Sequence, residues 1–237
     1  MSKPFKFKQF TVYQDRCAMK VGTDGVLLGA WASIESNPNS ILDIGAGTGV
    51  IALQLAQRSS AETIDAVELD NDAYEQCVTN LEASPWPDRL FCYHASFQEF
   101  VAEMDEPYDL VVSNPPFYGE GVSSGNSSRD KARQHQFLPF DKLLYGVSKL
   151  LSKQGVFSTI VPFTEETTFS AIAAQNGLFV NRMTRVKGSE HATIKRSLLE
   201  FSFLKTEVQP TTLTIALERH VYTEDYIALT RPFYLKM

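Results

Sequence analysis

The stretch Ile-Leu-Asp-Ile-Gly-Ala-Gly-Thr-Gly, residues 41–49, decides the fold of this 237-residue chain. Its apolar first half predicts a buried strand, and the spacing of apolar residues over Val50–Arg58 predicts a helix directly behind it. Glycine lacks a side chain, so the alternating glycines of the connecting turn let a ligand approach the backbone closely. A strand, a glycine-rich turn and a helix in this order indicate an open α/β sheet.

Short apolar runs alternate with helical patterns along the rest of the chain, which is typical of parallel strands joined by crossover helices. The predicted strands are Ser40–Ile44, Glu62–Glu68, Leu90–Tyr93, Tyr108–Ser113, Gly155–Val161, Phe179–Val186 and Leu198–Lys205. The predicted helices are Val50–Arg58, Asn71–Ala83, Phe140–Leu151 and Thr164–Asn176, with Gly177 just past the last one. The sequence therefore predicts an α/β fold with a Rossmann-like, seven-stranded, mostly parallel sheet that ends in a C-terminal antiparallel hairpin.

The length of the chain favours a single globular domain with one sizeable core. We expect residues 40–237 to form its body and residues 1–39 to form an N-terminal cap segment over the ligand cleft. Within that segment, Lys20–Trp31 is punctuated by glycines and leads into an apolar helix. The stretch 118–138 is rich in glycine and serine, and we expect a mobile loop there.

Composition and charge exclude several classes of protein. A net charge of −6 argues against a protein that coats nucleic acid without selectivity, because phosphate contacts need lysine and arginine. No apolar stretch reaches membrane-spanning length and the first residues lack an apolar signal core, so we expect a cytoplasmic protein. Cys17, Cys77 and Cys92 are unclustered, and the histidines are expected at surface or loop positions, so no metal site or disulfide frame is predicted.

The glycine-rich turn also narrows the choice of cofactor. A dinucleotide-binding turn would need its third glycine one position later than Gly49, where this chain has Val50. The carboxylate of Asp43, two residues before Gly45, and the alternation through Gly47 instead resemble motif I of the class I S-adenosylmethionine (SAM) methyltransferases. That resemblance implies SAM as cofactor, with Asp43 near its methionine amino group, directly or through water, and the three glycines making room for it.

Acids and aromatic residues at later strand ends complete the implied cofactor site. Glu68 ends the second predicted strand about 20 residues after the glycines, where an acid accepts the ribose hydroxyls in this fold. Asp70 is expected to cap the following helix instead. Ser96 and Phe97 stand where the fold contacts adenine, often through an acid that this chain lacks at that point.

The turn Asn114-Pro115-Pro116-Phe117 follows the fourth predicted strand and indicates a chemistry. Asn114 offers a side-chain carbonyl, and proline has no backbone N–H, so the turn presents carbonyl oxygens as hydrogen-bond acceptors toward an amine. Phe117 supplies a face for stacking on a planar group. By itself such a turn also occurs as a rigid loop, but at this strand position it resembles the amino-methyltransferases that act on adenine N6, guanine N2 or a glutamine side-chain amide.

The implied mechanism needs no strong general base. An exocyclic amine is a poor nucleophile because its lone pair is delocalised into the ring or carbonyl. Acceptance of both N–H protons by Asn114 and the Pro115 carbonyl would favour a pyramidal nitrogen whose lone pair points at the methyl group.

Both ends of the chain narrow the resemblance further. Phe10–Gln14, Met19–Trp31 and Tyr226–Leu235 resemble the bacterial family of adenine-N6 methyltransferases that modify valine tRNA beside its anticodon. The resemblance implies a tRNA substrate, an adenosine immediately 3′ of the anticodon, and no metal; no obligate protein partner is indicated.

Three alternatives remain open from the residues themselves. A protein glutamine-amide methyltransferase normally carries an N-terminal helical domain, and only 39 residues precede the first predicted strand. An RNA guanine-N2 methyltransferase fits the same motifs, since no residue visibly selects adenine. A non-catalytic RNA-binding protein on this fold would be expected to lose Asp43, the glycines or Asn114, and all are present.

Two basic segments are candidates for contacts with RNA phosphates. Taken alone, each is an ordinary solvated surface. If the substrate is a tRNA loop, the preferred phosphate contacts are Arg129, Lys131, Arg133, Lys187, Lys195 and Arg196.

Overall fold

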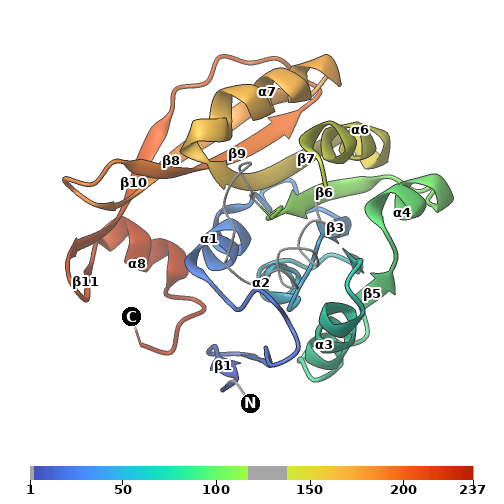
Figure 1. Ribbon diagram of the computed structural model, residues 1–237, viewed down its shortest axis with the longest axis horizontal. Helices are drawn as coiled ribbons and strands as arrows, with labels where there is room; N and C mark the ends of the chain where they lie inside the picture. Colours follow the sequence, from blue (N-terminus) through green and yellow to red (C-terminus); the bar gives the residue numbers. More distant parts are fainter. Residues whose placement is uncertain (1–2, 117–137, 237) are drawn as a thin grey trace, which may run out of the picture.

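A nine-stranded sheet runs through the computed structural model of the chain, which describes residues 3–116 and 138–236 (Figure 1). Its strands are β3 (Ser40–Ile44), β4 (Thr63–Glu68), β5 (Leu90–His94), β6 (Tyr108–Ser113), β7 (Leu151–Pro162), β8 (Phe179–Ser189), β9 (Ile194–Ser202), β10 (Thr211–Glu218) and β11 (Val221–Tyr222). A separate ribbon consists of β1 (Phe5–Lys6) and β2 (Thr11–Val12). The helices are α1 (Thr23–Trp31), α2 (Val50–Arg58), α3 (Asn71–Glu82), α4 (Phe97–Glu103), α6 (Phe140–Leu150), the 3-10 turn η1 (Phe163–Glu165), α7 (Glu166–Gln175) and α8 (Glu224–Thr230).

The strand order places the ends of several strands at one edge of the sheet. In space the strands follow the order β11-β10-β8-β9-β7-β6-β3-β4-β5. The strands from β5 to β7 pair in parallel, whereas β9 runs antiparallel to both β7 and β8, so the predicted α/β fold with its antiparallel hairpin is confirmed. Parallel strands end at the same edge, which is where ligands bind in open α/β sheets. We call this edge, where β3, β4, β6 and β7 end, the carboxyl edge.

The sheet is wider than the sequence predicts. β10 pairs in parallel with β8, and β11 pairs with β10. Leu213, Ile215 and Leu217 of β10 alternate as in a strand, but the sequence prediction does not include a strand there. The sequence prediction also omits helix α4, although Ser96 and Glu99 form the capping box that marks its start.

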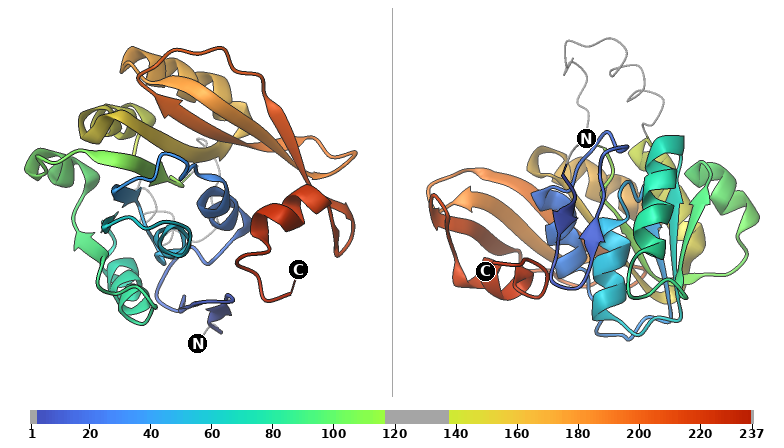
Figure 2. Two further views of the ribbon diagram at one scale, coloured as in Figure 1. Left: turned by 180° about the vertical axis from the view of Figure 1, so that it is seen from behind. Right: turned by 90° about the horizontal axis from the view of Figure 1, so that it is seen from below.

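Helices cover both faces of the sheet (Figures 1 and 2). Apolar residues of α1, α2 and α8 pack together on one face, and those of α4, α6 and α7 pack on the other. The right-hand view of Figure 2 shows α8, α1 and α2 side by side. The helix α7 ends as predicted, with Gly177 in the left-handed region at a φ of 76°.

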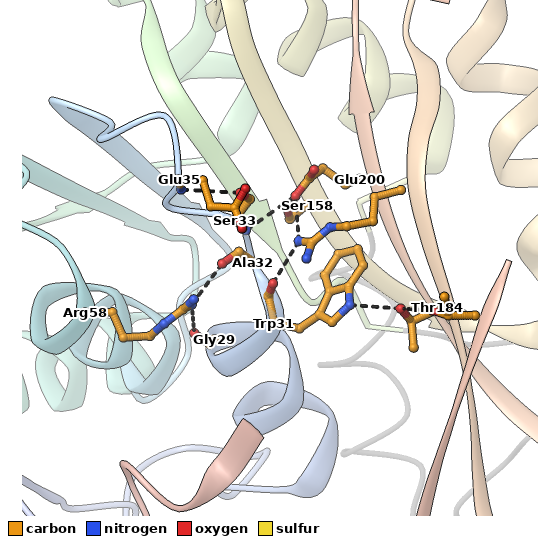
Figure 3. A network of polar contacts seen from close by, with 11 residues as sticks. Gly29, Trp31, Ala32, Ser33, Glu35, Arg58, Ser158, Thr184 and Glu200 are labelled. Atoms are coloured by element: carbon orange, nitrogen blue, oxygen red, sulfur yellow. Dashed lines mark hydrogen bonds and ion pairs between the residues drawn. The ribbon is translucent and has the colours of Figure 1, made fainter. Parts of the chain in front are cut away.

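The C-terminal end of α1 is fixed by two arginines (Figure 3). Arg58 Nη1 donates to the carbonyl oxygens of Gly29 and Ala32 at 2.8 and 2.9 Å. Arg182 lies over the Trp31 ring, 3.6 Å from its centroid, and donates to the Trp31 carbonyl at 2.8 Å and to Glu200 at 2.7 Å. These bonds satisfy carbonyls that a helix end leaves without partners, and they hold α1 against β8 and β9.

Candidate active site

A cavity of about 280 Å³ opens at the carboxyl edge, between the ends of β3, β4 and β6 and the start of α4. Parallel strands deliver residues from distant parts of the sequence to this edge. Six predicted site residues line the cavity: Gly45, Glu68, Ser96, Phe97, Pro115 and Pro116. The predicted cofactor residues and the Asn-Pro-Pro turn therefore border the same space.

The three glycines of the turn have different surroundings. Gly45, Gly47 and Gly49 have φ angles of 70°, 55° and 76°, in the left-handed region that favours glycine. A β-carbon at Gly45 or Gly47 would meet no described atom within 4 Å, so both border open space. A β-carbon at Gly49 would lie 3.0 Å from Cys77 Sγ, so this glycine allows the turn to pack on α3. Gly45 and Gly47 are thus the pair that leaves room for a ligand.

Asp43 is a fully buried carboxylate on β3. Its Oδ2 accepts a hydrogen bond from the backbone N–H of Ala52 at 3.1 Å, while its Oδ1 has no hydrogen-bond partner among the described residues. Burial raises the pKa of the Asp43 carboxyl to about 7, and the neighbouring charge of Glu68 adds to this shift. A buried carboxylate oxygen without a partner is suited to a cationic amine, because the positive charge would favour its ionised form.

Glu68, the last residue of β4, is held by backbone hydrogen bonds. Its Oε2 accepts from the N–H of Gly47 at 2.8 Å and its Oε1 from the N–H of Asp70 at 2.9 Å. Burial raises the pKa of the Glu68 carboxyl, while these bonds act in the opposite direction. Asp70 caps α3 as expected, since its Oδ1 accepts from the N–H of Ala73 at 2.9 Å. Glu68 thus presents an oriented carboxylate at the cavity wall.

Ser96 and Phe97 line the cavity, but the side chain of each is engaged in packing or capping within the protein. The Ser96 hydroxyl donates to Glu99 Oε2 at 2.7 Å and accepts from the Glu99 N–H at 3.2 Å, so it is engaged in capping α4. Phe97 is buried in the core between the sheet and α6. Both residues therefore shape the cavity wall, and the contribution of Ser96 comes from its backbone.

Gly146→Ala should weaken both the fold and cofactor binding. A β-carbon at Gly146 would lie 2.3 Å from Phe97 Cε1 and 2.9 Å from Val101 Cγ2, so the buried ring must shift. Overpacking of this kind costs about 1–3 kcal/mol of unfolding free energy. Because Phe97 lines the cavity, SAM should also bind more weakly. Thermal unfolding and SAM titration measure the two effects, with Gly188→Ala as control because its β-carbon would meet no described atom within 4 Å. An unchanged Tm in the Gly146 variant would contradict this packing account.

Asn114 follows β6 directly and lies beside α1. The end of β6 is fixed because Ser113 Oγ donates to the Ile44 carbonyl at 3.0 Å and the Ser113 carbonyl accepts from Thr159 Oγ1 at 2.8 Å. A β-carbon built at Gly25 would lie 4.0 Å from Asn114 Nδ2, which places the first turn of α1 against this side chain. The Lys20–Trp31 segment and the Asn-Pro-Pro turn are therefore neighbours in space.

The N-terminal segment is attached to the glycine turn through α3. Asn80 exchanges two 2.8 Å hydrogen bonds with the backbone of Tyr13 and donates to the Thr48 carbonyl at 2.9 Å. Gln76 accepts from two backbone N–H groups of the same segment. Burial raises the pKa of the Cys17 thiol to about 12, and nearby carboxylates at the end of β4 add to the shift. The sequence prediction omits Asn80 and Gln76, although polar residues at i, i+4 on the inner face of an amphipathic helix are a signal for them.

The predicted cations of the C-terminal region lie at the carboxyl edge. The turn of the β8–β9 hairpin carries them there, since Arg196 pairs with Pro162 at the end of β7. Lys195 is exposed, Lys187 Nζ donates to a carbonyl of the hairpin turn at 2.6 Å, and Arg196 Nε donates to Asp24 Oδ2 at 2.8 Å. Outside the described residues lie Phe117, Arg129, Lys131, Arg133 and the rest of the predicted loop up to residue 137.

The described residues contain neither a membrane-spanning helix nor a group of metal ligands. No helix in residues 3–116 and 138–236 is long and apolar enough to cross a membrane. Within the same ranges, no group of three or more histidine, cysteine, aspartate or glutamate residues is arranged to hold a metal ion.

Sequence comparisons find relatives along the whole chain. The model of the family described as Methyltransferase small domain matches residues 25–130. A tRNA1(Val) (adenine(37)-N6)-methyltransferase of Christiangramia forsetii is 56% identical, with 100% of this chain and 99% of that protein covered. A protein of the same name from Pseudoalteromonas translucida is 45% identical, with 98% of this chain and 99% of that protein covered.

Solved structures share the fold at low sequence identity. A predicted O-methyltransferase from Agrobacterium tumefaciens aligns with a TM-score of 0.67 at 19% identity, covering 89% of this chain and 96% of that one. TYW2 of M. jannaschii, solved in complex with AdoMet, aligns with a TM-score of 0.56 at 14% identity, covering 84% of this chain and 85% of that one. These similarities show that the chain has the fold of the class I methyltransferases.

Proposed function

The chain belongs to the family of tRNA1(Val) (adenine(37)-N6)-methyltransferases, and from this membership we propose how its own residues carry out the reaction. The activity is SAM-dependent methylation of N6 of adenine 37 in tRNA1(Val). The observation that carries the assignment of residues is that Gly45 of the glycine turn and both prolines of the Asn-Pro-Pro turn line one cavity. Eight relatives at 45–56% identity carry the adenine-N6 name, which favours adenine over the guanine and glutamine alternatives.

Two observations fit SAM to this cavity. Gly45 and Gly47 border open space, and the partnerless Oδ1 of the buried Asp43 suits the cationic amino group of methionine. We assign Glu68 to the ribose hydroxyls, because its carboxylate is oriented at the cavity wall, and we assign the Ser96 backbone and Phe97 to the adenine side. SAM supplies a methyl group that its sulfonium has already activated.

Asn114 and Pro115 position the target amine. The Asn114 side-chain carbonyl and the Pro115 backbone carbonyl accept its two N–H bonds, which favours a pyramidal nitrogen with its lone pair free for attack. Pro115 and Pro116 keep this turn rigid, since proline fixes φ. A loop adenosine must leave its stack to reach the turn, which costs less than flipping a base out of a helix. Phe117 remains the predicted stacking partner of the target base.

The substrate surface extends from this turn across the carboxyl edge toward the β8–β9 hairpin. We assign Lys187, Lys195 and Arg196 to the tRNA phosphates on this side, together with Arg129, Lys131 and Arg133 of the loop. Residues 1–39 form a cap that the Tyr13–Asn80 bonds fasten next to the glycine turn. A tRNA substrate also implies that the protein works in the cytoplasm.

Lys195→Glu should weaken tRNA binding and make it less sensitive to salt. Binding releases about one counterion fewer for each phosphate contact that is lost, so the magnitude of the slope of log K against log salt should decrease by about 1. Filter binding across a salt series measures both quantities. Lys153→Glu changes the same charge at an exposed position near the start of β7, at the opposite edge of the sheet, and should leave binding unchanged. Equal effects of the two variants would contradict a specific contact between Lys195 and a tRNA phosphate.

The assignment of activity is tested by product analysis. The protein is incubated with labelled SAM and total tRNA that lacks modifications, and the tRNA is digested to nucleosides. We expect the label in N6-methyladenosine of tRNA1(Val) alone. Label in N2-methylguanosine, or in protein instead of tRNA, would overturn the function.

A further inference from the structure

An exposed aromatic ring, Phe163, stands at the carboxyl edge outside the cavity. It follows Pro162, the last residue of β7, and is 37% exposed. β6 and β7 pair with Ser113 opposite Thr159, so Asn114 falls level with the residue after Thr159. Phe163 comes three residues later, which places its backbone about 10 Å beyond the level of Asn114 along the strand. That separation is too large for the target base and suits a nucleotide next to it.

One side of the ring is supported by Arg185, whose charge is balanced by an ion pair with Glu166. The Arg185 guanidinium lies over the Phe163 ring, 5.3 Å from its centroid. Arg185 Nε and Nη2 donate to the Glu166 carboxylate at 3.1 and 2.7 Å, and Ser197 Oγ donates to the same carboxylate. Burial alone would raise the pKa of Glu166, but these hydrogen bonds hold it below its usual value. Arg185 is therefore a fixed support for the ring, with its charge matched by Glu166.

Two basic residues lie on β9, the strand next to β7. Arg196 pairs through its backbone with Pro162 and donates to Asp24 Oδ2 at 2.8 Å, while Lys195 beside it is exposed. An aromatic face next to cations is the arrangement with which proteins bind single-stranded nucleic acid, because the cations follow the phosphates while the ring stacks on bases. In the strand order β9-β7-β6, Phe163 at the end of β7 lies between these basic residues and the Asn-Pro-Pro turn at the end of β6.

We propose that Phe163 stacks on a base adjacent to the methylated adenosine and thereby determines how tightly the anticodon loop is held. Arg185 and Glu166 are positioning residues, because they act through the ring. This inference rests on the proposed function, since it needs a tRNA loop with its target base at Asn114. It adds a substrate contact that lies outside the cofactor and amine sites.

The test uses the full chain, a tRNA1(Val) transcript and the variant Phe163→Leu. Loss of one base–aromatic stack should raise the KM for tRNA about tenfold, with kcat within about twofold and SAM affinity unchanged. Phe163→Trp should restore the KM because it keeps an aromatic face. Tyr145→Leu is the matched control: Tyr145 is also an exposed ring beside a cation, Lys149, but it lies in the middle of α6.

A second arm identifies the base. Transcripts with an abasic site on either side of the target adenosine are compared in the wild-type protein and the Phe163→Leu variant. One of the two abasic sites should raise the KM of the wild type and have no further effect in the variant. An unchanged KM in Phe163→Leu, a loss confined to kcat, or abasic effects of equal size in both proteins would overturn the stacking role. Absence of N6-methyladenosine in the wild-type reaction would instead overturn the proposed function, so the two failures are distinguishable.

Discussion

Replacing Asn114 with alanine should reduce methyl transfer at least about 100-fold while SAM affinity stays the same, the scale typical of losing one preorganised polar contact in an active site. The side chain lies at the end of β6, fixed by the Ser113 and Thr159 hydrogen bonds, and it is not among the residues that we assign to the cofactor. Its removal leaves the target amine with one acceptor instead of two. The effect should therefore appear in kcat, measured with saturating SAM and tRNA.

Two further variants make this prediction specific. Asn114→Asp keeps an acceptor oxygen of the same reach, and it should recover at least about tenfold of the activity that alanine loses. Asn39→Ala is the matched control, because Asn39 precedes β3 at the opposite edge of the sheet and is exposed. Near-normal turnover in Asn114→Ala would contradict the proposed mechanism.

Asp43→Asn should have opposite effects on cofactor binding and on stability. Hydrogen bonds to charged groups are worth about 1.5–3 kcal/mol, so loss of the carboxylate should lower SAM affinity at least about tenfold. The pKa of Asp43 is raised by burial to about 7, above its unfolded value of 3.8, so its contribution to stability is lost as pH rises through about 7. At about pH 8 the ligand-free variant, which carries no buried charge, should unfold at a higher temperature than the wild type.

The same titration predicts how the wild-type protein responds to pH. Protonation of Asp43 removes the negative charge that attracts the methionine ammonium, so SAM affinity should fall as pH decreases below about 7. Calorimetric titration from about pH 6 to pH 8 measures this dependence, which should be absent in Asp43→Asn. Asp65→Asn is the control, because Asp65 is also buried and its pKa is also raised by burial, but it lies three residues before the end of β4 and bonds to Tyr108 Oη at the start of β6, away from the carboxyl edge. A flat pH profile in the wild type would contradict the assignment of Asp43.

The parts of the fold that sequence reasoning finds are those with a local signal. The strands β3 and β6 are short, mostly apolar and almost entirely buried, and the glycine turn between β3 and α2 needs φ angles that only glycine adopts readily. β10 is half exposed, and its alternating Leu213, Ile215 and Leu217 are a weak signal beside its pairing with β8. Tertiary pairing decides such strands.

The same distinction applies to the site. Asp43 and Glu68 could be placed from spacing alone, because motif position fixes the strand end at which each one lies. The engagement of the Ser96 hydroxyl in a helix cap and the pairing of Arg196 with Asp24 depend on contacts between side chains, and the latter joins residues 172 positions apart. Sequence spacing predicts which residues reach the carboxyl edge, but it does not show which of their polar atoms are already engaged.

The most direct test of the account is a comparison of two tRNA1(Val) transcripts that differ only in the target nucleotide. One carries adenosine at position 37 and the other carries guanosine there. After incubation with the wild-type protein and SAM, fragment mass spectrometry locates any added methyl group. We expect one methyl group on N6 of adenosine 37 in the first transcript and none in the second. Methylation at another nucleotide, or equal methylation of both transcripts, would contradict it.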